Sequence, residues 1–170
     1  MAPLVRTSLA VAGRTPVLAV PGRSRQKVSV VAALCRSPAG RVRLYHESLP
    51  GRDVDGVAYA DFLRGRVLAR VGGPVVLLHD GLSAHRDEGV GFLADDYAAR
   101  LAVEEFPPYS PELNPVEPLW NWLKDKELAN FVPDDLTQLL LAAEHMISIA
   151  AHDQRRLRSF FEATPLGWWD

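Results

Sequence analysis

The sequence predicts an α/β fold in which a mixed sheet is flanked by helices. The apolar run VVLLH at residues 75–79 ends abruptly at Asp80, which is typical of a buried strand that delivers a carboxylate to a sheet edge. Apolar residues recur at helical spacing before and after this run. A proline-rich loop at residues 106–115 then leads into a helix that begins near Glu117.

The part of the chain before residue 75 contains candidate strands and one long helix. The candidate strands are residues 16–20, 27–35 and 41–48. The second and third are joined by Ser37-Pro38-Ala39-Gly40, which predicts a hairpin. Residues 54–71 form the helix, which Gly72-Gly73-Pro74 ends. Its apolar positions are Tyr59, Phe62, Leu63, Val67 and Val71.

The remaining elements follow the strand at 75–79. A helix around 86–97 and a short strand at 101–106 predict a right-handed crossover, so the last three strands are expected to be parallel. The helix at Glu117 is expected to run to about Leu128. Asp134 or Asp135 is then expected to cap a helix with an apolar stripe, before a last helical piece at 152–162. That stripe is Leu136, Leu139, Leu140, Ala143 and Ile147. Trp168 and Trp169 are expected to dock on the core.

Composition limits the class of protein. The 170 residues suit one domain, and 48% hydrophobic content is enough for a packed core. Cys35 is the single cysteine, which excludes a disulfide framework or a cysteine zinc site and suits a reducing cytoplasm. Arg6 and Arg14 interrupt the apolar start of the chain, which argues against a signal peptide, and no stretch suits a membrane span. We therefore expect a cytoplasmic protein with no membrane partner.

Asp80 and Glu117 are the candidate site residues that stand out. One follows a strand and the other opens a helix, so both carboxylates are carried by rigid elements, as a hard divalent cation requires. Each also has a simpler interpretation: Asp80 as the cap of the next helix, and Glu117 as an acid that complements a helix dipole. A P-loop ATPase is a poor alternative because no glycine-rich phosphate loop is present. A zinc hydrolase is also weak, since His79 and His85 lack the spacing of a helical ligand pair.

Two motifs together resemble a known family. The first is Asp-Gly-x-x-x-His, from Asp80 to His85, directly after the strand. The second is Tyr109-Ser110-Pro111 and Asn114-Pro115-Val116-Glu117, with Trp120 and Lys124. They resemble the second half of the catalytic domain of mariner-like insertion-sequence transposases, the DDE group with an RNase H-like fold. Gly81 departs from the pattern, since many relatives have Asn at this position.

The resemblance extends more loosely over residues 3–130 and implies a domain organisation and a chemistry. We expect residues 1–130 to form a partial RNase H-like catalytic domain, and 131–170 a helical extension packed on it. The implied activity is DNA cleavage and strand transfer with two Mg²⁺ (or Mn²⁺) ions. Asp80 and Glu117 are the implied catalytic and metal-binding residues. His85, Arg86 and Lys124 are the implied substrate-binding residues.

The family needs a third acid, which relatives carry on an early strand, usually as Asp-Glu-Ser. No Asp or Glu precedes Glu47, so no residue of this chain takes that role by position. Asp53 and Asp55 come too late and are interpreted as turn and cap residues. We therefore expect an N-terminally shortened transposase that is inactive alone. The alternative is a non-catalytic remnant that binds DNA weakly or pairs with an intact transposase.

The absent strand would be the central one of an RNase H-like sheet, so its two neighbours would be left with unpaired edges. Unsatisfied backbone groups cost on the order of 1–3 kcal/mol each, against a typical stability of ~5–15 kcal/mol. We therefore expect one of three outcomes: residues 16–20 pair with these edges, a strand from a partner pairs with them, or the chain is poorly stable. A homodimer or the product of an upstream reading frame is a possible source of such a strand. DNA is the expected substrate despite the net charge of −2, because relatives carry their sequence-specific contacts on a separate N-terminal region.

Overall fold

The computed structural model of the chain describes residue 12 and residues 27–169, and the candidate strand at 16–20 lies outside them. Four strands are present in this part: β1 (Val28–Arg36), β2 (Val42–Pro50), β3 (Val75–His79) and β4 (Leu101–Glu105). The α-helices are α1 (Gly56–Phe62), α2 (Glu88–Asp96), α3 (Val116–Trp122), α4 (Leu136–His152) and α5 (Gln154–Glu162). Each predicted strand from residue 27 onward therefore has a counterpart, and β3 has the bounds that the sequence predicts.

The described strands form two separate two-stranded sheets. β1 and β2 are antiparallel, from Val28 opposite Pro50 to Arg36 opposite Val42. Their connection is the predicted hairpin, in which Gly40 has a φ of 76° that favours glycine. β3 and β4 are parallel, as a strand-helix-strand crossover requires. Of the last three strands, which the sequence predicts to be parallel, β3 and β4 pair in parallel, whereas β2 is hydrogen-bonded to β1 in the other sheet.

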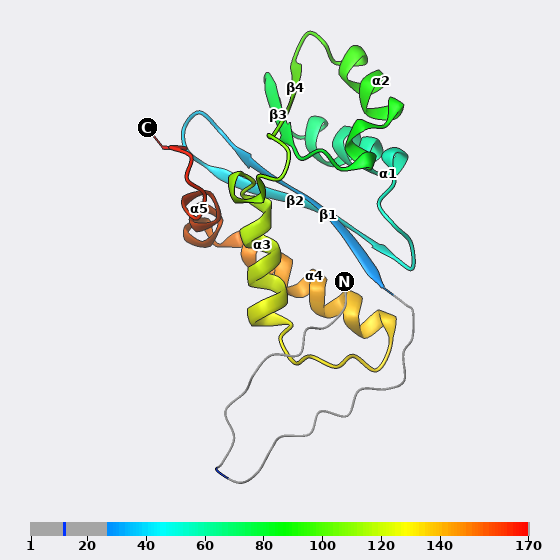
Figure 1. The fold of residues 1–170 in the computed structure, drawn as a ribbon, viewed down its shortest axis with the longest axis vertical. Coiled ribbons are helices and arrows are strands. Elements are labelled where there is room, and N and C mark those ends of the chain that lie inside the picture. The colour runs from blue at the N-terminus through cyan, green and yellow to red at the C-terminus, as the bar shows by residue number, and fades with distance from the viewer. Residues whose placement is uncertain (1–11, 13–26, 170) are drawn as a thin grey trace.

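Two hydrophobic cores lie on the two sides of the β1–β2 ribbon, which crosses the molecule between them (Figure 1). One core joins α1 and the π-helical turn η1 (Leu63–Leu68) to α2 and to the β3–β4 pair. Phe62, Leu63 and Leu93 are almost fully buried in it. Asp55 caps α1, since its carboxylate accepts a hydrogen bond from the Ala58 N–H at 2.8 Å, which confirms its interpretation as a cap residue.

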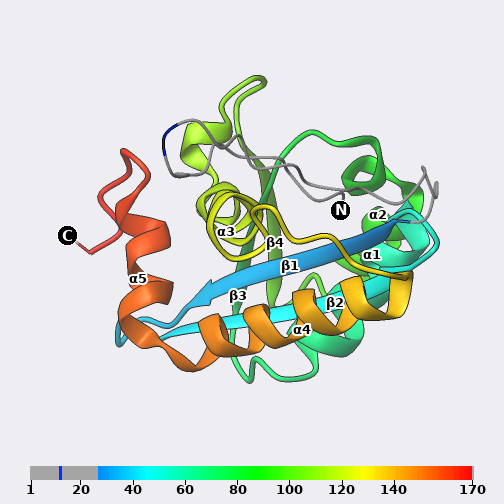
Figure 2. The same ribbon diagram turned by 90° about the horizontal axis from the view of Figure 1, so that it is seen from below.

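The other core lies between the β1–β2 ribbon and helices α3, α4 and α5, and α4 runs along the ribbon (Figure 2). Leu119, Ile147 and Leu157 have no exposed surface, so residues beyond 130 share a core with α3. Asp135 caps α4 through the Gln138 N–H. Trp168 and Trp169 pack against this core, as expected, and the Trp168 ring meets Phe161 edge-on at 5.1 Å.

The helices differ from the sequence expectations mainly in where they divide. The predicted helix at 86–97 is a 3-10 turn, η2 (Ser83–Arg86), followed by α2, because Asp87 between them caps α2 through the Gly89 N–H. The helix that begins near Glu117 is α3, which continues as the π-helical turn η4 (Leu123–Glu127). Within residues 27–169, no helix combines the length and the apolar character needed to cross a membrane.

Candidate functional site

A cavity of about 500 Å³ lies between the two sheets. It is lined by every residue of β1 from Val30 to Arg36 and by every residue of β3. Because side chains of successive strand residues point to opposite faces, a cavity lined by consecutive residues runs along the strand edges rather than over one face. Side chains of α1, η1 and α3 close it on its two sides.

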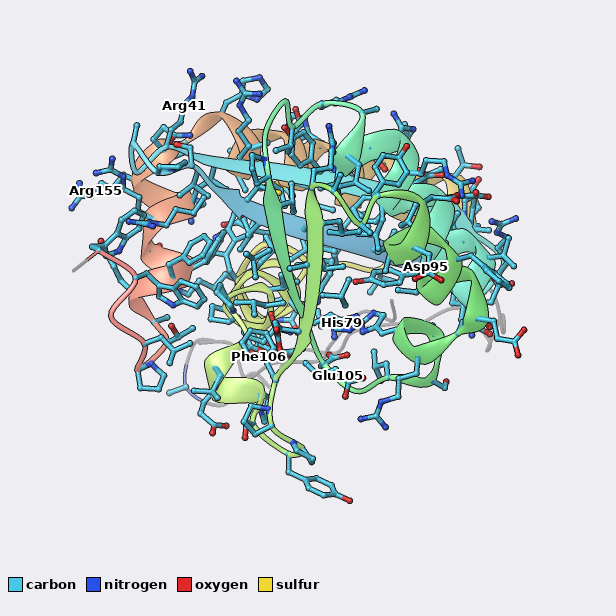
Figure 3. The ribbon with its side chains drawn as sticks, turned by 90° about the horizontal axis from the view of Figure 1, so that it is seen from above. Arg41, His79, Asp95, Glu105, Phe106 and Arg155 are labelled. Carbon is cyan, nitrogen blue, oxygen red and sulfur yellow. The ribbon has the colours of Figure 1, made fainter. Side chains whose placement is uncertain are left out.

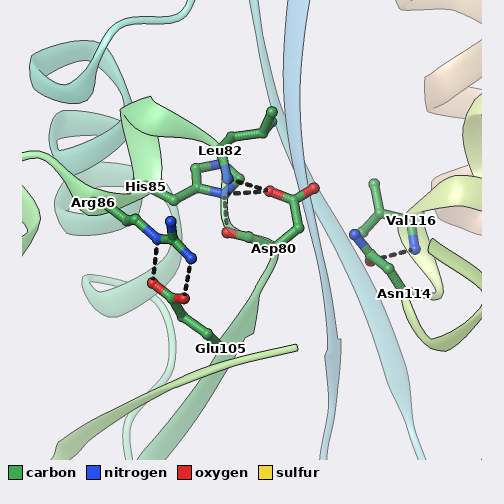
Figure 4. A network of polar contacts seen from close by, with 7 residues as sticks. All are labelled: Asp80, Leu82, His85, Arg86, Glu105, Asn114 and Val116. Carbon is green, nitrogen blue, oxygen red and sulfur yellow. Dashed lines mark hydrogen bonds and ion pairs between the residues drawn. The ribbon is translucent and has the colours of Figure 1, made fainter. Parts of the chain in front are cut away.

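Asp80 and Glu117 both line this cavity, although they come from different elements. Asp80 directly follows β3, and Glu117 lies in the first turn of α3. The start of α3 is held by Asn114, whose side-chain oxygen accepts a hydrogen bond from the Val116 N–H at 3.1 Å. The main-chain oxygen of Asn114 accepts the Glu117 N–H at 3.0 Å. Figure 4 shows Asp80, which follows β3, opposite Asn114, which precedes α3.

The Asp80 carboxylate is oriented by the loop that follows it. Nδ1 of His85 lies 2.7 Å from Oδ1 of Asp80 and 3.0 Å from its main-chain oxygen (Figure 4). The Leu82 N–H donates to the same Oδ1 at 3.3 Å. Both contacts use one carboxylate oxygen, so Oδ2 is the atom that is available to a ligand. A histidine that donates to a carboxylate in this way fixes both the ring tautomer and the direction of the acid.

Three aromatic rings stack behind Asp80. The ring centroid of His85 lies 4.1 Å from that of Tyr59 and 5.2 Å from that of His79. Burial, and then the neighbouring His85, lower the pKa of His79, which is 6% exposed. Burial, with a further contribution from the negative charge of Asp80, raises the pKa of the Tyr59 phenol. Both pKa shifts favour the uncharged forms of His79 and Tyr59, so the His85 ring packs against two neutral, buried rings.

Arg86 lies beside this group but is already paired. Its Nε and Nη2 donate to the two oxygens of Glu105 at 2.9 and 2.7 Å, a bidentate pair that joins the turn after β3 to the end of β4 (Figure 4). His79, Glu105 and Phe106 gather at the ends of the two strands (Figure 3). Gly81 makes room for the pair, since a Cβ at that position would lie 2.6 Å from Nη2 of Arg86.

The predicted substrate-binding residues are not all placed together. His85 lines the cavity, whereas Arg86 and Lys124 do not. Lys124 lies on η4, two turns beyond Glu117, and forms no ion pair with another described residue. The structure thus unites Asp80, Glu117 and His85 and leaves the two basic residues outside the cavity.

Sequence reasoning missed the contributions of His79 and Asn114. Sequence reasoning gave His79 no role beside Asp80, whereas in the structure both residues line the cavity and His79 stacks on His85. Asn114 belongs to the quoted Asn-Pro-Val-Glu motif, and its position before the helix is a signal for a capping residue. Tyr59 was recognised only as a core position. Its contact with His85 joins two segments that are distant in the sequence, so no local pattern reveals it.

The two cavity carboxylates fit a hard divalent cation in chemistry but form only part of a ligand set. Carboxylate oxygens are the ligands that Mg²⁺ and Mn²⁺ prefer. Among the described residues, however, no group of three acidic, histidine or cysteine side chains is placed to hold a metal ion. The donors present suit such an ion, and their number leaves its coordination incomplete.

Comparisons with known proteins identify the family and the fold of the chain. No curated protein matches the chain. Among solved structures, the chain is similar to a protein in the crystal structure of the Mos1 strand transfer complex, with 18% identity and a TM-score of 0.58. The match covers 96% of this chain and 47% of the other, so the chain spans about half the length of that protein, with which it shares an RNase H-like α/β fold. A model of the family described as DDE superfamily endonuclease matches residues 2–139. This match spans most of the chain, which therefore belongs to the DDE superfamily of endonucleases.

Proposed function

We propose that the chain is a catalytic-domain portion of a DNA transposase, whose complete form cleaves DNA strands and transfers them to a target. The observation that carries the proposal is that Asp80 and Glu117, from separate elements, line one cavity. The family match and the fold shared with a transposase support the same reaction class. DNA is the proposed substrate, since the similar structure is described as a strand transfer complex.

Asp80 and Glu117 are the proposed catalytic and metal-binding residues. When bound, Mg²⁺ or Mn²⁺ would supply charge stabilisation to a phosphoryl group and lower the pKa of a bound water. Oδ2 of Asp80 and the Glu117 carboxylate would hold the ion. His85 would keep Asp80 oriented through its Nδ1–H. His85, Arg86 and Lys124 are the proposed phosphate contacts, although Arg86 would first have to leave Glu105.

We further propose that the chain is inactive alone. Two carboxylates offset less of the charge of two cations than three do, and the described residues offer no third ligand. The same observation favours the second candidate, a non-catalytic remnant that binds DNA weakly or pairs with an intact transposase. A homodimer and the product of an upstream frame are the proposed partners. We propose a cytoplasmic location, which a single cysteine in 170 residues suits. Residues 1–130 are the proposed catalytic part, with 131–170 as a helical extension.

Mn²⁺ titration tests the site without requiring activity. Calorimetry and thermal unfolding of the chain should show binding that raises the Tm, and Asp80→Asn or Glu117→Gln should each abolish that rise. Glu112→Gln is the matched control, because Glu112 is an exposed acid in the proline-rich loop that precedes Glu117 and does not line the cavity. A Tm rise that survives Asp80→Asn would refute the assigned site. No Mn²⁺ dependence in the parent chain would favour the non-catalytic remnant.

A further inference from the structure

The tip of the β1–β2 hairpin and helix α5 form one surface that carries four exposed arginines. The side chain of Gln154, at the start of α5, holds the backbone of Val42 through hydrogen bonds of 3.2 and 2.7 Å. One turn further along α5, Nη2 of Arg158 donates to the Gly40 oxygen at 3.2 Å. Arg41 lies between these two bound residues, so its backbone is held against α5. We call Arg36, Arg41, Arg155 and Arg158 the arginine surface.

The Trp169 ring gathers two of these side chains. Cζ of Arg36 lies 4.8 Å from the centroid of the ring, and Cζ of Arg158 lies 5.3 Å from the same centroid. A guanidinium over an aromatic ring uses its flat face for that contact, which leaves N–H groups at its edge available to donate. Two cations held at one ring also repel each other, and an anion that contacts both offsets this repulsion.

The arginine surface lacks the acidic partners that other arginines of the chain have. None of its four members forms an ion pair with a described residue. The neighbouring Arg156 differs, since it lies over the Trp122 ring and its Nε is 3.7 Å from the Asp153 carboxylate. Glu162, the one acid within α5, is exposed and forms no described ion pair either. In a chain of net charge −2, such a group of positive charges indicates a surface that meets an anionic ligand.

The arginine surface is separate from the candidate catalytic residues. Figure 3 shows Arg41 and Arg155 at one margin of the molecule, away from His79 and Glu105 at the strand ends. Of the four arginines, Arg36 alone also lines the cavity. A ligand that contacts all four therefore extends outside the cavity over the hairpin tip and α5.

We propose that the arginine surface binds the phosphate backbone of duplex DNA, as a second contact outside the cavity of Asp80 and Glu117. The choice of DNA as the anion rests on the proposed function. Guanidinium groups suit phosphate because they donate two parallel N–H bonds to its oxygens. A duplex carries one phosphate charge per about 1.7 Å of its axis, so a single segment offers partners to all four side chains. Contacts of this kind position DNA without reading its sequence.

Fluorescence anisotropy of the full chain with a labelled duplex of about 20 base pairs, at several salt concentrations, tests the proposal. EDTA in the buffer removes metal ions, so the cavity carboxylates contribute no metal-mediated contact. Arg41→Gln and Arg155→Gln should each weaken binding by about tenfold at low salt. Each should also reduce the slope of log K against log salt concentration by about 0.9, the value for one phosphate contact. Duplexes of two unrelated sequences should bind equally.

Arg52→Gln is the matched control, because it removes the same charge from an exposed arginine beyond the other end of β2. A strand of 9 residues rises about 3.3 Å per residue, so this position lies well beyond the Debye length of about 10 Å at 0.1 M salt. The control should change neither the affinity nor the slope. Arg155→Lys keeps the charge and should keep the salt slope of the parent. Urea unfolding checks that each variant is folded, and the Arg41 and Arg155 variants test the surface independently.

Three results would overturn the proposal. The first is a parent chain that does not bind the duplex in EDTA at low salt. The second is an equal loss of affinity in Arg52→Gln, which would show that binding depends on overall charge. The third is an unchanged salt slope in both the Arg41 and the Arg155 variants. Because no metal ion is present, these results are distinct from the Mn²⁺ titration: duplex binding at the arginine surface can persist when that titration fails, and the reverse.

Discussion

The imidazole of His85 is joined to Asp80 at two points, since its Nδ1 lies 2.7 Å from Oδ1 of the carboxylate and 3.0 Å from the main-chain oxygen. One ring nitrogen thus fixes both the side chain and the backbone at the residue where β3 ends. The Tyr59 ring, 4.1 Å from that of His85, supports the imidazole from behind. These contacts hold the Asp80 carboxylate at the place where it lines the cavity.

His85→Ala should weaken Mn²⁺ binding by about tenfold, because side chains that hydrogen-bond to a metal ligand, as His85 does to Asp80, contribute roughly 10–100-fold to affinity. His152→Ala is a suitable control, since the Nδ1 of His152 bonds only to the Ser148 oxygen on the surface of α4. Calorimetric titration of both variants gives the comparison. Equal affinity in the His85 variant and the parent would show that the imidazole does not orient a metal ligand.

Gly81→Asn should separate Arg86 from Glu105, because a Cβ at position 81 would lie 2.6 Å from Nη2 of Arg86. The displaced group is the end of a flexible side chain, so we expect the loss of the ion pair with little unfolding. The hydrogen bond from Arg86 lowers the pKa of the Glu105 carboxyl from its ordinary value near 4.5. NMR titration of Glu105 should show that pKa return towards 4.5 in the variant.

The same pair predicts the direction of a pH effect on stability. The pKa of Glu105 is lower in the folded chain than in the unfolded one, so the pair stabilises fully above pH 4.5, and this stabilisation is lost as pH falls through the folded pKa. Glu105→Gln should therefore remove part of the acid destabilisation below pH 4.5. Urea unfolding of parent and variant at pH 7 and at pH 4 measures the difference, and an identical pH dependence would contradict it.

Cys35 should react slowly with alkylating reagents in the folded chain. Burial raises the pKa of its thiol to about 11, and the nearby Arg43 lowers it by less. At pH 8 the thiolate fraction is then on the order of one in a thousand, against about a quarter for an ordinary cysteine of pKa ≈ 8.5. Iodoacetamide labelling in buffer and in urea should differ by on the order of 100-fold. Equal rates would show that β1 does not shield the thiol.

Ile147→Ala should destabilise the chain by about 2–4 kcal/mol, because Ile147 is fully buried in the core beneath the β1–β2 ribbon. Leu141→Ala on the same helix should change stability by less than about 0.5 kcal/mol, since Leu141 is 64% exposed. Urea unfolding gives both values. We expect the isolated parent chain to unfold below about 60 °C, near the range of ~45–65 °C for mesophile domains. The urea unfolding experiments should therefore be carried out at low temperature.

Much of the fold could be predicted because its signals are local. The run VVLLH predicts β3 with the observed bounds, and Asp55 and Asp135 cap the helices that follow them. The apolar stripe of α4 predicts that Leu139, Ala143 and Ile147 are buried. Each of these features depends on backbone preferences and side-chain spacing within a few residues. Whether Asp80 and Glu117 bind metal stays a prediction, although both face one cavity.

The sequence by itself determined which segments form strands and helices, that α1 and α4 begin at capping aspartates, and which acids stand at the ends of rigid elements. Only the tertiary structure decided that Arg86 is paired with Glu105, that Tyr59 and His79 stack on His85, and that β1 and β3 border one cavity without pairing. The physical reason is range. Periodicity and capping act within a few residues, whereas these contacts join segments that are brought together by the packing of the whole chain.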